Sequence, residues 1–201
     1  VKRTALGRMA HEGAWPARAV KGQPIVIYTG DDSRNEYIYK YVSNKVWDDA
    51  DINGGLAAGA KYLDEGRLYV AKFNADGTGQ WIELTINDDA IRNYGAYTFI
   101  DQADVLVHAR LAADALGATK MDRPEWGAVN PLNNEVYMSL TNNSNRVDPT
   151  ATPTGNQLKP DAANPRYYDD GEGNKGNPNG HIIRWKETGS QSATAFTWDI
   201  Y

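Results

Sequence analysis

The sequence predicts a mainly β protein made of two four-stranded antiparallel units joined by one helix. Three observations favour this fold: strand-like runs recur through both halves of the chain, the two halves share one order of elements, and the aromatic composition is skewed. The chain has 12 Tyr and 6 Trp against 3 Phe, together with 19 Gly. Aromatic residues are enriched in strands, and glycine supplies the tight turns between them.

The first half contains four strand-like runs, and a Gly-rich turn over residues 74–79 predicts that the last two form a hairpin. The runs cover residues 24–28, 36–42, 67–73 and 80–85. One helix is expected next, near residues 102–116. Asp101 can cap its N-terminus, and Gly117 suits the position after its last turn. Arg110 and Asp114 lie four residues apart and are expected to pair on its surface.

Strand-like runs return in the second half, on either side of a long polar segment. They cover residues 126–129, 135–141, 181–185 and 195–200. The segment between them, residues 142–179, is rich in Asn, Pro, Gly and Asp. A loop of this length in a compact domain is usually functional or disordered.

The two halves resemble an internal repeat, because each opens with a glutamate, Glu12 or Glu125, and continues as four strands. Four antiparallel strands make up one blade of a β-propeller. We therefore expect a first blade over 1–96, a connecting helix over 97–117 and a second blade over 118–201. A single β-sandwich has the same density of strands and stays open as an alternative.

Composition excludes several classes of function. With 21 basic and 26 acidic residues and no basic stripe, nucleic-acid binding is not expected. No run of eighteen apolar residues exists, so no membrane span is expected either. The chain has no cysteine, which removes thiolate nucleophiles and cysteine-ligated metals. It starts at Val1 and stops in a strand-like run, which favours an internal fragment of a longer protein.

Glu12 and Glu125 are the first candidates for a metal site. The innermost strand of a propeller blade lines the central channel, so the repeat would point both carboxylates at one axis. Hard cations such as Ca²⁺ bind several oxygens of this kind. A solvated glutamate at the start of a strand is the alternative for each residue taken alone.

Arg123 is the candidate for binding an anion. Pro124 follows it and favours an extended conformation, in which Arg123 and Glu125 would share one face. A guanidinium fork suits the oxygens of a phosphate. A surface ion pair between the two residues is the alternative.

Asp31 and Asp32 form an acidic cluster directly after a strand-like run, with Glu36 nearby. The cluster resembles a loop that could hold Ca²⁺, but it lacks the full spacing of an EF-hand. A turn held by Asx-type hydrogen bonds is the alternative. The histidines, which are His11, His108 and His181, are interpreted as structural.

The segment Met121-Asp122-Arg123-Pro124-Glu125-Trp126 resembles a signature of the PhoX-type alkaline phosphatase family. Supporting matches follow in family order along the chain, in residues 2–8, 11–14, 30–32, 36–40 and 179–185. The resemblance implies an exported bacterial phosphomonoesterase, periplasmic or extracellular, with a six-bladed propeller and small phosphate-ester substrates. It implies a calcium and iron cluster in the central channel, bound by Glu12 and Glu125, with Arg123 contacting phosphate.

One departure from the family pattern bears on activity. The family's iron site uses a cysteine and this chain has none, so the iron site is expected to be incomplete. The chain alone is therefore expected to be inactive, and exposed sheet surfaces could allow it to self-associate. Two other functions stay open: a different propeller hydrolase such as a Ca²⁺-dependent lactonase, and a non-catalytic propeller module that binds a partner.

Overall fold

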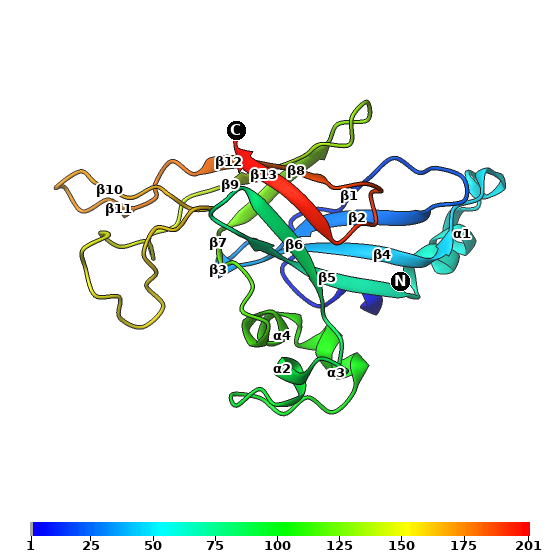
Figure 1. Cartoon of the computed structure of the whole chain (residues 1–201), viewed down its shortest axis with the longest axis horizontal. Helices are drawn as coiled ribbons and strands as arrows, with labels where there is room; N and C mark the ends of the chain where they lie inside the picture. Colours follow the sequence, from blue (N-terminus) through cyan, green and yellow to red (C-terminus); the bar gives the residue numbers. More distant parts are fainter. Residues whose placement is uncertain (1) are drawn as a thin grey trace.

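The computed structural model describes residues 2–201, and one curved nine-stranded sheet dominates it (Figure 1). The strand order is β1-β2-β4-β5-β6-β13-β12-β9-β8, and every neighbouring pair is antiparallel. The strands are β1 Trp15–Pro16, β2 Pro24–Gly30, β4 Ile38–Val46, β5 Gly66–Phe73, β6 Thr78–Glu83, β8 Pro124–Val129, β9 Val136–Leu140, β12 His181–Glu187 and β13 Ala195–Ile200. The prediction of a mainly β fold is confirmed.

All eight predicted strands are present, and each half of the chain forms one four-stranded antiparallel run. The first run is β2-β4-β5-β6 and the second is β8-β9-β12-β13. The prediction of two separate sheets is wrong, because β6 pairs with β13 and joins the runs into one sheet. Both strands would otherwise leave a row of unpaired backbone groups at an edge. The division into blades at residues 96 and 117 stays a prediction.

The sheet curls until its two outer parts meet. Pro124 at the start of β8 packs directly on Gly30, where a Cβ atom would lie only 2.6 Å from the Pro124 carbonyl oxygen. Farther along the same seam, the rings of Trp15 and Trp126 meet edge to face with centroids 6.0 Å apart. A glycine at position 30 is therefore what lets the two ends of the sheet approach.

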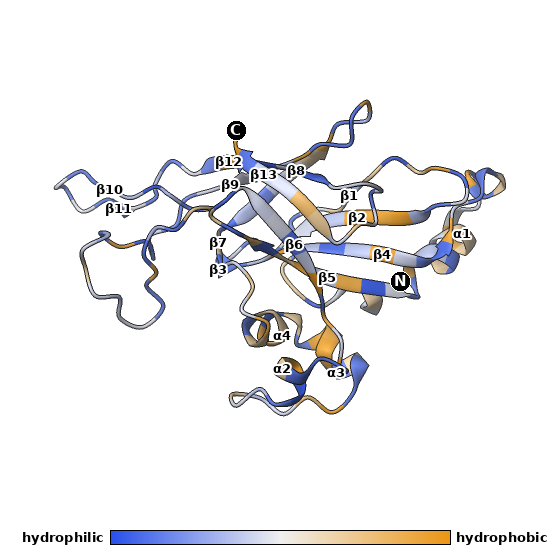
Figure 2. Ribbon diagram, viewed as in Figure 1, coloured by the Kyte–Doolittle hydropathy of each residue, from blue (hydrophilic) through white to orange (hydrophobic). Residues whose placement is uncertain are grey.

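Successive side chains along each strand point to opposite faces of the sheet, so the hydrophobic core has two parts. One face of the sheet buries a cluster that includes Val26, Tyr28, Trp81 and Trp185. The opposite face buries Ile27, Tyr39, Tyr41, Leu68 and Val70 together with Val105, Ala109 and Ala112 from the helices. Figure 2 shows hydrophobic residues along β2 and β5 and in α3, in keeping with this division.

The expected single helix is interrupted, and the prediction of only one helix is wrong. The helices are α1 Gly55–Leu63, α2 Asp89–Arg92, α3 Gln102–Val107 and α4 Ala109–Ala115, with short 3₁₀ turns at Thr4–Leu6 and Asp49–Asp51. Asp101 does cap α3, its Oδ1 accepting from Asp104 N at 2.8 Å. His108 then leaves the helical conformation at φ −111° and ψ 42°, which separates α3 from α4. Helix α1 escaped prediction because Tyr62 is its one buried residue.

Short strand pairs complete the structure. Strand β3, Arg34–Glu36, pairs with β7, Met121–Asp122, and β10, Tyr168–Asp169, pairs with β11, Lys175–Gly176. The polar segment 142–179 is largely irregular, and part of it extends away from the large sheet (Figure 1). Among the described residues, no helix is both long and apolar enough to cross a membrane.

Candidate functional site

Three segments that are far apart in the sequence meet at the end of β2. Glu12 N donates to Gly30 O at 3.3 Å, and Asp32 N donates to Ala10 O at 3.0 Å. Pro124 packs on Gly30 from the other side. The fold therefore brings together the segments that carry Glu12, Asp31, Asp32, Arg123 and Glu125.

Arg123 occupies the single position between two strands that belong to different sheets. Strand β7 before it pairs with β3, while β8 after it pairs with β9. The turn between the two sheets gives Arg123 a φ of 45°. The expectation that Arg123 is extended is therefore wrong. A left-handed conformation costs a residue with a side chain about 1–2 kcal/mol, so the surroundings must hold Arg123 in place.

Asp32 holds the side chain of Arg123 by two parallel hydrogen bonds. Arg123 Nε lies 3.1 Å from Asp32 Oδ1 and Nη2 lies 3.1 Å from Oδ2. A guanidinium has five N–H donors, and this contact uses one of them at Nε and one at Nη2. Within residues 2–201, Nη1 of Arg123 makes no hydrogen bond or ion pair. Asp32 thus fixes the orientation of the Arg123 guanidinium.

Glu12 and Glu125 carry carboxylates that other side chains leave free. Glu12 is exposed and Glu125 is half-buried. Within residues 2–201, neither carboxylate makes a hydrogen bond or an ion pair. Carboxylate oxygens of this kind fit a hard cation such as Ca²⁺. No group of three His, Asp or Glu side chains converges as a metal site in residues 2–201, so an ion bound here would need further ligands.

Asp31 is fully buried and is neutralised by Arg110 from α4. Arg110 Nε and Nη2 lie 2.5 Å from the two oxygens of Asp31, and Ala10 N donates to Oδ1 at 3.2 Å. The predicted pair of Arg110 with Asp114 is wrong, because Asp114 accepts instead from Lys120 Nζ at 2.7 Å. A carboxylate buried in the sheet requires a counter-charge far more than an exposed one does. Each of the two predicted Asp residues is thus engaged by an arginine.

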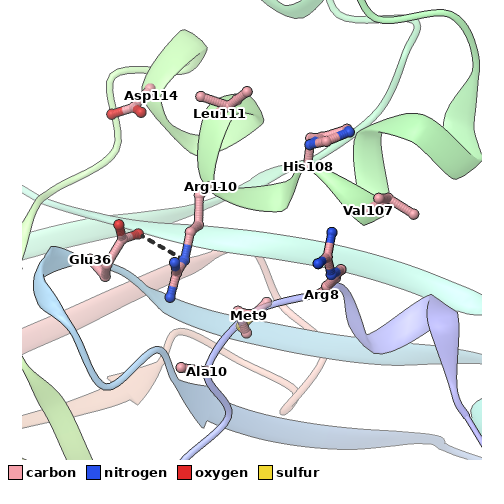
Figure 3. Close-up of a pocket in the computed structure, with 9 residues that line it drawn as sticks. All are labelled: Arg8, Met9, Ala10, Glu36, Val107, His108, Arg110, Leu111 and Asp114. Carbon is pink, nitrogen blue, oxygen red and sulfur yellow. Dashed lines mark ion pairs between the residues drawn. The ribbon is translucent and has the colours of Figure 1, made fainter.

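A pocket of about 580 Å³ lies beside the Asp31–Arg110 pair. Figure 3 shows Arg110 reaching from α4 toward Glu36, with Arg8 and His108 farther along the pocket. Arg110 Nε lies 3.5 Å from Glu36 Oε2. Burial, with the nearby charge of Asp31, raises the pKa of Glu36 to about 7, although Arg110 opposes the shift. Glu36 therefore changes its charge near neutral pH next to the site.

Each of the histidines contacts neighbouring polar groups. His11 Nε2 donates to Gly7 O at 3.0 Å, and its Nδ1 lies 2.9 Å from Thr29 Oγ1. His181 Nε2 donates to Ala163 O at 2.8 Å, and burial lowers its pKa. His108 lies 3.5 Å from Asp104 on the helix surface.

Sequence reasoning found the charged residues of the site but missed their pairing. The Asp31–Arg110 and Asp32–Arg123 pairs join residues 79 and 91 positions apart. The signal that could have indicated them was the presence of two adjacent aspartates at a strand end, since a buried acid such as Asp31 requires a cation.

Comparison with known proteins assigns the chain to a family. Residues 1–201 match the model of the family described as alkaline phosphatase PhoX. The chain belongs to this family. The resemblance carried by residues 121–126 is thus confirmed over the full length of the chain.

A solved PhoX structure has the same fold over the whole chain. It is Pseudomonas fluorescens PhoX in complex with vanadate, a transition state analogue, with 40% sequence identity and a TM-score of 0.77. The match covers 100% of this chain and 32% of the solved chain. This chain therefore spans about a third of the length of that PhoX. A search of curated proteins found no match.

Proposed function

We propose that this chain supplies part of the active site of a PhoX-type phosphomonoesterase. The observation that carries the proposal is the position of Arg123 on the same seam as Glu12 and Glu125, whose carboxylates make no hydrogen bond or ion pair within residues 2–201. Membership of the PhoX family and the likeness to a PhoX complex with vanadate support the same reaction class.

Arg123 binds the phosphate ester in this proposal. Asp32 fixes its guanidinium before substrate arrives, so little conformational freedom is lost when the oxyanion binds. Two guanidinium donors on one edge match two phosphate oxygens and stabilise the negative charge that the transition state spreads over them.

Glu12 and Glu125 hold metal ions in this proposal, with calcium and iron as the family's ions. Bound cations supply positive charge to the phosphoryl oxygens during displacement. The two carboxylates contribute by binding the cations and placing them, and they do not act as proton donors. Because the chain has no cysteine, its residues fit the calcium part of such a cluster better than a thiolate-bound iron.

Three further properties belong to the same proposal, and the first of them follows from family membership. The enzyme acts on small phosphate esters in the periplasm or outside the cell. The 201-residue chain alone has no turnover, since it spans 32% of the solved PhoX and its two free carboxylates need further ligands. Trp126, which is 66% exposed, offers an apolar surface for self-association of the isolated chain.

Hydrolysis of an aryl phosphate tests this function. A protein of family length that contains this chain should release phosphate, lose activity with a chelator and regain it with calcium. The 201-residue chain should release none under the same conditions. Hydrolysis of a lactone with phosphate esters left intact would contradict the proposal, and so would binding without turnover of either substrate.

A further inference from the structure

A buried polar network lies directly beside Arg123 and has no part in the proposed chemistry. Its centre is Asp122, whose side chain is fully buried. Asp122 Oδ1 accepts from Asn143 Nδ2 at 2.7 Å and from Arg146 Nε at 2.6 Å, and Oδ2 accepts from Asn177 Nδ2 at 3.0 Å. All three donors come from the polar segment 142–179. The pattern of strands in the sequence does not account for the polar composition of this segment.

Arg146 is the cation of this network, and its side chain is also fully buried. Its three nitrogens all have acceptors. Nε donates to Asp122, Nη1 donates to Lys159 O at 2.8 Å and lies 3.2 Å from Asp161 Oδ2, and Nη2 donates to Lys120 O at 3.0 Å. A guanidinium so completely bonded is fixed in position and fixes its partners in turn.

The network takes the place of a strand along the free edge of β7. One edge of β7 pairs with β3, through Arg34 opposite Asp122. On the other edge, Asn164 Oδ1 accepts from Asp122 N at 3.0 Å, and Asn164 Nδ2 donates to Lys120 O at 3.0 Å. Side chains of the long segment therefore hold Lys120 and Asp122, which precede Arg123 in the chain.

We propose that Arg146 is a positioning residue for phosphate binding, acting through Asp122 on the backbone of Arg123. Arg123 needs such support because its φ of 45° is unfavourable for a residue with a side chain. The C-terminal side of Arg123 is held by the packing of Pro124 on Gly30 and by a hydrogen bond from Thr141 N to Arg123 O at 3.1 Å. The polar network holds its N-terminal side. The inference rests on the proposed role of Arg123 in binding phosphate.

The test uses Arg146→Lys in a protein of family length that contains this chain. Lysine keeps the charge but cannot reach Asp122, Lys120 O and Lys159 O together. The matched control is Arg166→Lys, since Arg166 lies in the same segment, is exposed and donates to Tyr168 Oη. We expect the inhibition constant of inorganic phosphate to rise about tenfold or more in Arg146→Lys, because small displacements at a site are costly. Bound metal should stay unchanged.

A double-mutant cycle separates positioning from general loss of structure. In an Arg123→Ala background, Arg146→Lys should change the phosphate constant by less than about twofold, because both changes remove the same interaction. An equal loss in both backgrounds would overturn the proposal, and so would no loss in either.

A second readout does not depend on phosphate binding. The reaction of Arg123 with phenylglyoxal, followed by mass spectrometry, should be severalfold faster in Arg146→Lys, since a displaced guanidinium loses the protection of Asp32. Labelling of Arg184 should not change. If the unmodified protein does not bind phosphate, the proposed function fails and this labelling alone decides the positioning role. If Arg146→Lys does not fold, Asn164→Ala takes its place, with the same direction expected in both readouts.

Discussion

Lys40 in β4 and Glu187 in β12 form an ion pair inside the sheet, with Nζ and Oε1 3.5 Å apart and both side chains almost fully buried. Tyr28 Oη donates to the same Glu187 oxygen at 2.6 Å, and Trp81 Nε1 donates to it at 3.1 Å. Lys40 Nζ also donates to Ala193 O at 2.6 Å. The pair links the two four-stranded runs, since β4 belongs to the first and β12 to the second.

Removal of either partner should destabilise the protein strongly, because the other charge would stay buried without its counter-ion. We expect Lys40→Met and Glu187→Gln each to lower the free energy of unfolding by about 3–5 kcal/mol. The double variant should lose less than the sum. Urea denaturation measures all three, and Lys175→Met, which removes an exposed pair with Asp169, is the matched control. A loss in Lys40→Met no larger than in the control would contradict the role of the pair.

The same lysine should make stability depend on pH. Burial lowers the pKa of Lys40 to about 8, although Glu187 opposes the shift. Between pH 8 and the ordinary lysine value, the unfolded chain holds the proton that the folded protein has released, so stability rises with pH. Relative to Lys40→Met, the unmodified protein should gain about 1–2 kcal/mol between pH 8 and 9.5.

Denaturation at several pH values checks this dependence, and the comparison must stop below pH 10. Burial raises the pKa of Tyr28, and the unfolded chain would ionise this tyrosine first, which lowers stability above pH 10. A difference between the two proteins that stays constant from pH 7 to 9.5 would show that Lys40 does not titrate in this range.

The proposed metal role of the two glutamates makes a prediction about charge. Glu12→Gln and Glu125→Gln keep the size of each side chain but remove the charge that a hard cation selects. In a protein of family length, each of the two variants should lose bound calcium and most phosphatase activity. The midpoint of its unfolding transition should not change. Elemental analysis and activity assays measure both effects, with the exposed Glu172→Gln as control. Unchanged calcium in Glu125→Gln would remove Glu125 from the site.

Arg123→Lys should separate phosphate binding from metal binding. Lysine cannot contact Asp32 at two points and still offer a two-donor edge to phosphate. We expect inorganic phosphate to bind about tenfold more weakly or worse, with the metal content unchanged. Arg184→Lys is a close control, because Arg184 makes the same two-point contact with Asp199, at 2.9 and 2.5 Å, away from the site. Equal effects of the two changes would argue against a role for Arg123.

Gly30→Ala should disturb the seam on which the site lies. The added Cβ would lie 2.6 Å from the backbone oxygen of Pro124, so β8 would have to move. We expect a loss of about 1–3 kcal/mol in unfolding free energy. Gly95→Ala is the control, since nothing lies within 4 Å of a Cβ there. Thermal and urea denaturation that gave the same result for both variants would show that the seam is not tightly packed.

Several local features could be predicted because local patterns specify them. The strands follow from runs of alternating apolar residues and of aromatic residues, such as residues 36–42 and 67–73. In a strand, the side chains of such a run point to one or both faces of the sheet and are buried there. The cap at Asp101 and the end at Gly117 follow from side-chain and backbone preferences that act within a few residues. The break at His108 coincides with packing of its ring against Tyr97 at a centroid distance of 4.8 Å, a contact that the helical pattern of residues 102–116 does not indicate.

The candidate site shows the same limit. Glu12, Arg123 and Glu125 could be named from the repeat and from the residue types, and the family could be identified from residues 121–126. Their surroundings could not, since Asp32, Arg110 and Arg146 form their ion pairs across separations of 91, 79 and 24 positions. Ion pairs between segments so distant leave no periodic signal in the sequence.

The sequence by itself determined which segments become strands, where a helix is capped and ends, and which residues are candidates for binding a cation or a phosphate. These properties depend on side-chain chemistry and on backbone preferences over a few residues. The tertiary structure decided that β6 pairs with β13, that Gly30 lets β8 approach β2, and that Arg123 adopts a left-handed conformation between two sheets. These features depend on closure of the sheet and on burial of charges, which arise only when the whole chain has folded.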